Sequence, residues 1–113
     1  MKKLIDKITI LEQVEYAEAV KKWGYNHSAH EGYAVLREEV EELAEDVDEI
    51  EGHAGGMWHS VKCDDFEDAR YNARQIKGLA IRAAAEAVQV AAMAQKFIDS
   101  EERRLEGEQT TSD

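Results

Sequence analysis

Proline is missing from the chain, and cysteine occurs once, at Cys63. Because proline is excluded from helix interiors, its absence leaves room for long helices. A single cysteine cannot form a disulfide within the chain, so the sequence does not indicate an oxidising compartment. The first residues, Met1–Asp6, lack the apolar stretch of a signal peptide, and we therefore expect a cytoplasmic protein.

Basic residues are also few, because 14 Lys and Arg stand against 25 Asp and Glu, which gives a net charge of −11. A field of this sign repels phosphate backbones and attracts cations, so we expect no nucleic-acid partner. Long apolar runs are missing as well. The most apolar stretch, residues 78–98, is interrupted by Arg82, Glu86 and Gln89, so we expect no membrane span.

The residues that fill most of the chain are Ala, Glu, Leu, Lys, Arg and Gln, which lose the least free energy on entering a helix. A length of 113 residues suffices for one hydrophobic core. We therefore expect an all-α fold, with a single domain over residues 1–105 and a disordered polar tail over residues 106–113.

Two long helices are expected in the first half of the chain. Apolar residues recur at helical spacing over residues 4–23, and Gly24 follows where a C-terminal glycine stop belongs. Ser28 and Glu31 have the spacing of a capping box, which marks the start of the next helix. An apolar stripe then continues over residues 29–50, which predicts a second long helix with one face on a core.

A loop, a short helix and a third long helix are expected in the second half. Three glycines among histidines and a tryptophan predict a flexible loop over residues 52–59. Asp64 or Asp65 is suited to cap a short helix, which leads with a kink near Gly78 into a third long helix that ends near residue 104.

The third long helix is apolar on nearly every side between Leu79 and Ile98, and such a helix is normally buried. Two partner helices cannot cover it, so we expect an antiparallel helical bundle that is completed by oligomerisation as a homodimer or homotetramer. The positions expected near a two-fold interface are Ile81, Val88, Ala92 and Phe97.

Residues 38–51 contain nine acids in fourteen positions and no base. Like charges one turn apart destabilise a helix by roughly 0.2 to 0.5 kcal/mol per pair, and a hard divalent cation would supply the missing positive charge. Glu39 and Glu42 lie three residues apart beside the apolar stripe, so both can face the edge of the core. The other interpretation of the same run is a solvated acidic face with incidental ions.

Glu86 and Gln89 repeat this three-residue spacing on the third long helix, among apolar side chains. An ionised carboxylate left unpaired in apolar surroundings costs several kcal/mol, so Glu86 needs a partner. Arg82, one turn back, is one candidate, and a shared metal ion is the other. If the second and third long helices pack together, this pair joins Glu39 and Glu42 around one ion or ion pair.

The run from Glu38 to Glu42 is an E-E-x-x-E segment, and Glu86 opens an E-x-x-(D/Q) segment on a later apolar helix. These segments, within residues 27–98, resemble the MazG-like, all-α nucleoside triphosphate pyrophosphohydrolase family. The resemblance implies a nucleoside triphosphate as substrate, hydrolysed to a monophosphate and pyrophosphate in the service of nucleotide-pool house-cleaning. It also implies Mg²⁺ as cofactor, with Mn²⁺ as a substitute.

Carried over by position, the resemblance implies Glu39, Glu42 and Glu86 as metal ligands. Glu38 and Glu39 are the implied catalytic residues, with Glu38 supporting the ligands or orienting water. Gln89 stands where the family usually has Asp, which removes one charge. The alternative function is therefore a catalytically degenerate helical oligomer that binds a nucleotide or metal without turnover.

Substrate contacts are expected from Gln89, from Lys96, which could reach a phosphate, and from Trp58, which could lie over a base. A rival register takes Asp65 and Asp68 as the second acidic pair, and it shortens the gap between the two acidic segments. We rank it second because a glycine-rich segment precedes it.

Overall fold

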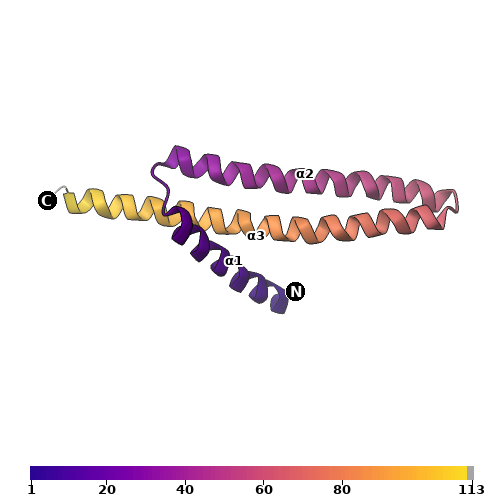
Figure 1. Cartoon of the computed structure of the whole chain (residues 1–113), viewed down its shortest axis with the longest axis horizontal. Helices are drawn as coiled ribbons and strands as arrows, with labels where there is room; N and C mark the ends of the chain where they lie inside the picture. The colour runs from indigo at the N-terminus through magenta and orange to yellow at the C-terminus, as the bar shows by residue number, and fades with distance from the viewer. Residues whose placement is uncertain (112–113) are drawn as a thin grey trace. The chain divides into compact units, whose positions relative to one another are not determined.

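The structure of the chain, a computed structural model, describes residues 1–111, with side chains described as far as residue 107. It is 92% helix and has no strand in the described part, which confirms the predicted all-α class. Three helices pack against one another: α1 (Lys2–Trp23), α2 (Ala29–Lys62) and α3 (Phe66–Thr111) (Figure 1).

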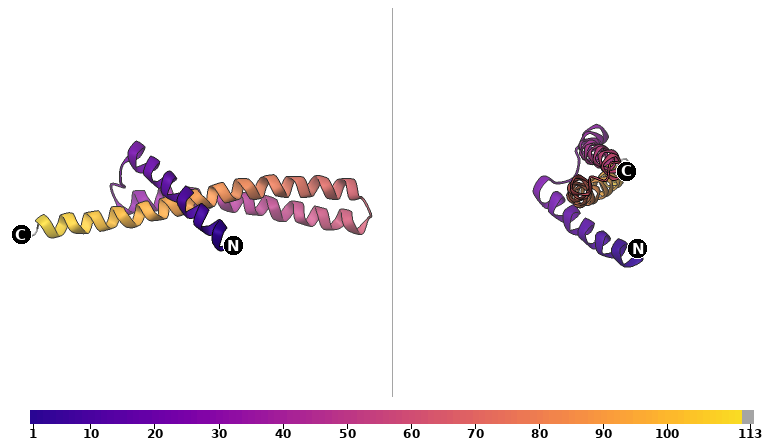
Figure 2. Two further views of the ribbon diagram at one scale, coloured as in Figure 1. Left: turned by 90° about the horizontal axis from the view of Figure 1, so that it is seen from below. Right: turned by 90° about the vertical axis from the view of Figure 1, so that its right-hand side faces the viewer.

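The chain folds into two compact units whose boundaries fall inside the two long helices. Unit 1 contains Met1–Val40 and the chain from Ala87 onward, and in it α1 runs across α3 (Figure 2). Unit 2 contains Glu41–Glu86, where α2 and α3 run side by side in opposite directions (Figures 1 and 2). The antiparallel pairing predicted for the bundle is therefore present within this unit.

Helix α1 ends where the sequence predicts. Gly24 has a φ of 74°, in the left-handed region that glycine enters without steric cost, and its N–H donates to the Val20 carbonyl at 2.8 Å. Lys21 and Lys22 lie in the last turn, where positive charge interacts favourably with the helix dipole. The Tyr16 hydroxyl donates a hydrogen bond to Asp99 and so joins α1 to α3 within unit 1.

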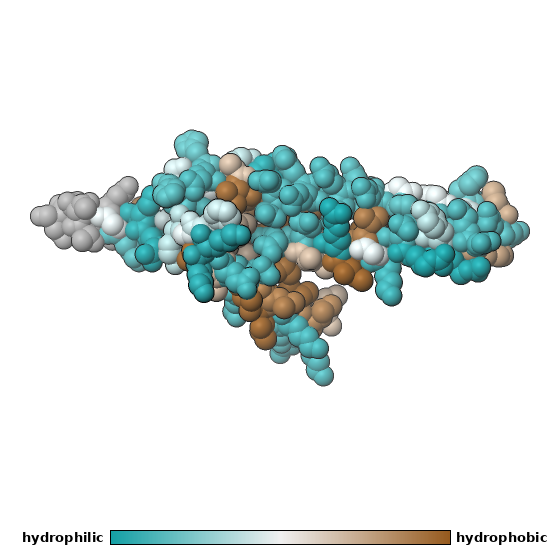
Figure 3. Space-filling model, viewed as in Figure 1, coloured by the Kyte–Doolittle hydropathy of each residue, from teal (hydrophilic) through white to brown (hydrophobic). Residues whose placement is uncertain are grey.

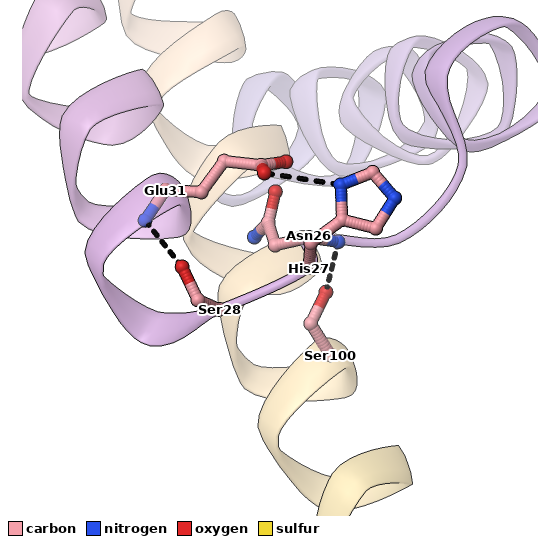
Figure 4. A network of polar contacts seen from close by, with 5 residues as sticks. All are labelled: Asn26, His27, Ser28, Glu31 and Ser100. Atoms are coloured by element: carbon pink, nitrogen blue, oxygen red, sulfur yellow. Dashed lines mark hydrogen bonds and ion pairs between the residues drawn. The ribbon is translucent and has the colours of Figure 1, made fainter.

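The start of α2 is fixed by the predicted N-cap (Figure 4). The Ser28 hydroxyl accepts a hydrogen bond from the Glu31 N–H at 3.0 Å. The Glu31 carboxylate lies 3.1 Å from Nδ1 of His27. The N–H of Asn26 donates to the Ser100 hydroxyl at 3.0 Å, which ties the connection between α1 and α2 to α3.

The loop predicted over residues 52–59 is wrong, because α2 continues through all three glycines to Lys62. Glycine costs about 1 kcal/mol in a helix interior, and tertiary contacts within unit 2 offset that cost. His53 Nδ1 lies 2.9 Å from the Asn72 side-chain oxygen, and Ser60 donates a hydrogen bond to Asp68. These contacts hold the second half of α2 against α3.

The short helix predicted before the third long helix is also wrong as a separate element, because its residues form the first turns of α3. A tight connection precedes α3, in which Asp64 has a φ of 57°, and the Asp65 carboxylate accepts a hydrogen bond from the Asp68 N–H at 3.1 Å. Asp65 is therefore the cap.

The disordered tail predicted over residues 106–113 is wrong for residues 106–111, because α3 includes them. Residues 112–113 lie outside the described part.

The interior holds few apolar side chains. Among the described residues, the buried apolar ones are Ala69, Ala92 and Met93, whereas six polar ones are buried: Asn26, Asp46, Ser60, Asn72, Lys96 and Ser100. Helix α1, described over its whole length, has no buried residue, and hydrophobic surface gathers over it (Figure 3).

No helix within residues 1–111 combines the length and apolar character needed to cross a membrane.

Candidate metal centre

Two carboxylates from different helices meet in unit 2. Glu42 on α2 and Glu86 on α3 each offer a carboxylate oxygen within 4.8 Å of the other. Glu42 is exposed and Glu86 is half-buried. From the sequence, Glu42 and Glu86 were expected to meet only if the second and third long helices pack face to face. In unit 2 the two helices do pack in this way.

Proximity to Glu86 raises the pKa of Glu42 above its ordinary value of 4.5. The main cause is a hydrogen bond that the protonated Glu42 carboxyl shares with Glu86, and repulsion from the Glu86 charge acts in the same direction. Arg82 opposes this shift, and Asp46 adds to it. The site therefore disfavours two neighbouring carboxylate charges, and either a proton or a cation would relieve the repulsion.

Arg82 pairs with Asp46, since its Nε lies 3.4 Å from Oδ1 of Asp46. Asp46 lies one turn after Glu42 and is only 4% exposed, and its second carboxylate oxygen is buried without a hydrogen-bond partner in the described structure. The arginine that sequence analysis offered as a partner of Glu86 thus contacts a different acid. Asp46 was not singled out from the sequence, although its spacing from Glu42 places it on the same face of α2.

Glu39 and Glu38 lie just before the unit boundary on α2. Glu39 is half-buried and belongs to unit 1, where it lines a cavity. Glu38 is exposed. The first of these acids therefore lines a cavity, whereas Glu38 faces solvent.

Gln89, on the next turn of α3 after Glu86, belongs to unit 1 and contacts α1. Its Nε2 donates to the Glu15 carboxylate at 2.9 Å, between half-buried side chains that lie 74 residues apart in sequence. No sequence pattern predicts this pair, because Glu15 belongs to no motif.

A cavity of about 500 Å³ lies in unit 1, and Glu39, Gln89 and Lys96 are among its lining residues. Lys96 is 5% exposed, so it is a buried lysine. A hydrogen bond from His27 lowers the pKa of Glu31, another lining residue, and the Lys96 charge contributes to the same shift. Two of the predicted substrate contacts, Gln89 and Lys96, thus line one cavity.

The third predicted substrate contact, Trp58, lies in unit 2. It is 61% exposed, with the Lys62 ammonium 5.4 Å from its ring centre. The indole that lines the cavity of unit 1 is that of Trp23, the last residue of α1. Sequence analysis missed Trp23 because it precedes a glycine stop, where an exposed aromatic residue is unremarkable.

The rival acidic pair, Asp65 and Asp68, has other partners. Asp65 caps α3, and Asp68 accepts hydrogen bonds from Ser60 and from the Asn72 amide. These contacts hold the end of unit 2 together. Glu86 is therefore the better candidate for the second acidic segment.

The donor atoms that Glu42 and Glu86 bring together in unit 2 are all carboxylate oxygens. Hard divalent cations such as Mg²⁺ and Mn²⁺ prefer such oxygens, and no thiolate or imidazole of the group would favour a softer metal. The residues present therefore fit a magnesium ion. Comparison of the chain with models of protein families, with curated proteins and with solved structures finds no match.

Proposed function

We propose that the chain is a magnesium-dependent nucleoside triphosphate pyrophosphohydrolase of the MazG-like kind, in which Glu39, Glu42 and Glu86 hold the metal. The observation that carries the proposal is the approach of Glu42 to Glu86, which brings two like charges close together. A bound cation would relieve this repulsion, and Mg²⁺ held by one or two carboxylates is common where phosphates are bound.

The cavity of unit 1, which Glu39 lines, supports a nucleotide as the ligand. Its volume of about 500 Å³ lies in the range of small-molecule sites. The buried Lys96 ammonium attracts an anion such as a phosphate, and the Trp23 ring offers a flat apolar surface for a base. In this proposal Lys96 binds phosphate and Gln89 contacts the substrate. The role of lying over the base, predicted for Trp58, belongs to Trp23.

The reaction would be an in-line displacement at the α-phosphorus. Water forms the new P–O bond and the bond to the β-phosphate bridging oxygen breaks, so that pyrophosphate leaves with the electron pair. Glu38 orients the water and Glu39 takes up its proton, while Lys96 stabilises charge on the phosphates. When bound, Mg²⁺ supplies positive charge that offsets the charge on the phosphate oxygens.

Incubation with a panel of canonical and modified triphosphates in the presence of Mg²⁺, followed by detection of pyrophosphate and monophosphate, tests this proposal. We expect turnover of at least one nucleotide and none in the presence of excess chelator. Binding of a nucleotide or of Mg²⁺ without turnover of any member of the panel would favour the degenerate oligomer instead.

We also propose that the working form is a homodimer or homotetramer in the cytoplasm. The support is the small apolar interior and the exposure of apolar side chains: Ile81 on α3 is 64% exposed, and Leu11 on α1 is 56% exposed. Burial of apolar surface yields roughly 25 cal/mol per Å², so a second copy is a natural cover for these side chains.

A further inference from the structure

The first half of α1 is a helical segment that the rest of the chain leaves uncovered. All of residues 1–11 are exposed, and half-buried side chains begin only at Glu12. From there on, Glu15 and Tyr16 form hydrogen bonds with α3. A helix of about a dozen residues is marginal in water by itself, because most helix stability in proteins comes from packing of an apolar face. The first three turns of α1 therefore need a packing partner.

The apolar side chains of this segment follow a heptad pattern. Leu4, Ile8 and Leu11 succeed one another in steps of four and three residues, and Ile5 widens the same face. Ile8 is 37% exposed, and the other three are at least half exposed. Figure 3 shows hydrophobic surface over this helix. The pattern ends at Glu15, which is held by Gln89 of α3. Such steps form the seam of a coiled coil, which a second helix completes.

The residue types along the seam favour a second copy of the same helix in parallel orientation. Parallel two-stranded coiled coils prefer a β-branched residue at one seam position and leucine at the other, and here Ile8 alternates with Leu4 and Leu11. The charges beside the seam agree. In a parallel pair, Lys7 lies next to Glu12 of the second copy, five positions further along, and two-fold symmetry forms this contact twice. In an antiparallel pair the two residues would lie on opposite sides of the seam.

We propose that residues 1–14 pair with the same residues of a second copy as a parallel, in-register coiled coil along a two-fold axis. This inference rests on the homo-oligomer proposed above and adds its interface, and it does not depend on hydrolysis. The chain carries a net charge of −11, which opposes association. Helix α1 has five lysines against four acids, so two copies meet there with little repulsion.

Disulfide cross-linking of the full-length chain tests the orientation. In a Cys63→Ser background, Leu4→Cys and Leu11→Cys each place a cysteine opposite its own copy only if the helices are parallel and in register. Both should form a covalent dimer under mild oxidation. Gln13→Cys, at an exposed position on the opposite face of α1, is the control and should react about 100-fold more slowly, because pairing raises the effective concentration from micromolar to millimolar.

The ion pair gives an independent test by sedimentation of the uncrosslinked protein. Glu12→Lys sets like charges against each other at both contacts and should raise the dissociation constant of the pair about five-fold, the combined effect of two exposed ion pairs. Adding Lys7→Glu restores opposite charges and should return the constant to within about two-fold of the parent. Asp6→Lys makes the same charge change on the outer face and should have no effect.

Thermal unfolding of each variant separates loss of fold from loss of pairing, and Leu11→Cys carries the first test if Leu4→Cys does not fold. Cross-linking no faster than that of Gln13→Cys, in a parent that is oligomeric, would overturn the inference and leave the proposed homo-oligomer standing. A Glu12→Lys chain that associates as the parent does, or that Lys7→Glu does not rescue, would have the same meaning. A parent that is monomeric at micromolar concentration would refute both, and the proposed hydrolysis would be unaffected.

Discussion

At the scale of single residues, the raised pKa of Glu42 couples proton binding at this carboxylate to cation binding. Its pKa is raised chiefly by Glu86, so above that pKa the folded state carries a repulsion that the unfolded state lacks. The free energy of unfolding of the metal-free protein therefore falls as pH rises from 4.5, the ordinary pKa of Glu, through the raised pKa of Glu42. It increases again when the pH is lowered through the same range. The groups that face Glu42 in this titration are Glu86, Arg82 and Asp46.

We predict that Mg²⁺ binding to the parent protein strengthens as pH rises through this window and releases protons, because the metal competes with the Glu42 proton. Calorimetry in buffers of different ionisation enthalpy measures the proton release. Glu42→Gln should abolish the release and weaken binding by at least 10- to 100-fold, the range for losing even an outer partner of a metal. Glu45→Gln, an exposed acid on the same helix, is the control. Binding that does not vary with pH would contradict the prediction.

Part of the site follows from sequence because it depends on local spacing. Three-residue steps place Glu39 beside Glu42, and the same step relates Glu86 to Gln89, so helix geometry alone orders each pair. The partner of Gln89 does not follow, because Glu15 lies 74 residues away and only tertiary packing selects it. The burial of Lys96 is missed for the same reason, since a lone lysine on a helix is usually solvated.

At the scale of secondary-structure elements, the end of α1 and the caps that start α2 and α3 were predicted, whereas the continuity of α2 past residue 50 and of α3 past residue 104 was not. The Gly24 stop, the Ser28 cap and the Asp65 cap each depend on one residue with a specific backbone or hydrogen-bonding role. Whether residues 52–59 are helical depends instead on the sum of several small contributions to stability. There the contacts of His53 and Ser60 with α3 outweigh the poor helix propensity of glycine.

A continuous α2 predicts the sign of two glycine substitutions. Gly55 has open space where a Cβ would be added, so Gly55→Ala should stabilise the protein by about 0.5 to 1 kcal/mol. A Cβ at Gly32 would lie 2.6 Å from the Asn26 amide nitrogen and 2.8 Å from a Phe97 ring carbon, so Gly32→Ala should destabilise it. Chemical denaturation measures both changes. A destabilising Gly55→Ala would indicate a loop after all.

At the scale of the whole molecule, one chain leaves much apolar surface uncovered. Among the side chains of α1 that are at least half exposed are Leu4, Ile5, Ile10, Leu11 and Val14. Such a surface is typical of a subunit interface. The sequence located the expected interface on the third long helix, where Ala92 is fully buried within the chain and Ile81 is exposed. The exposure of α1 adds a second surface that the sequence did not single out.

We predict a mass of two or four chains by light scattering at micromolar concentration. Leu11→Glu should shift the mass toward the monomer, because a charge would be buried in the interface. Gln13→Glu, on an exposed position of the same helix, should not. A parent mass near 12.8 kDa would refute the assembly.

We propose that carboxylates from two helices hold the magnesium that drives pyrophosphate release. The most direct measurement is the rate of pyrophosphate release as a function of Mg²⁺ concentration, for the parent, Glu86→Gln and the exposed-acid control Glu67→Gln, with the best nucleotide of the panel. The parent and the control should show the same saturable dependence on Mg²⁺, and Glu86→Gln should lose activity about 100-fold or more. Undiminished release by Glu86→Gln, or release by the parent without a divalent cation, would contradict the account.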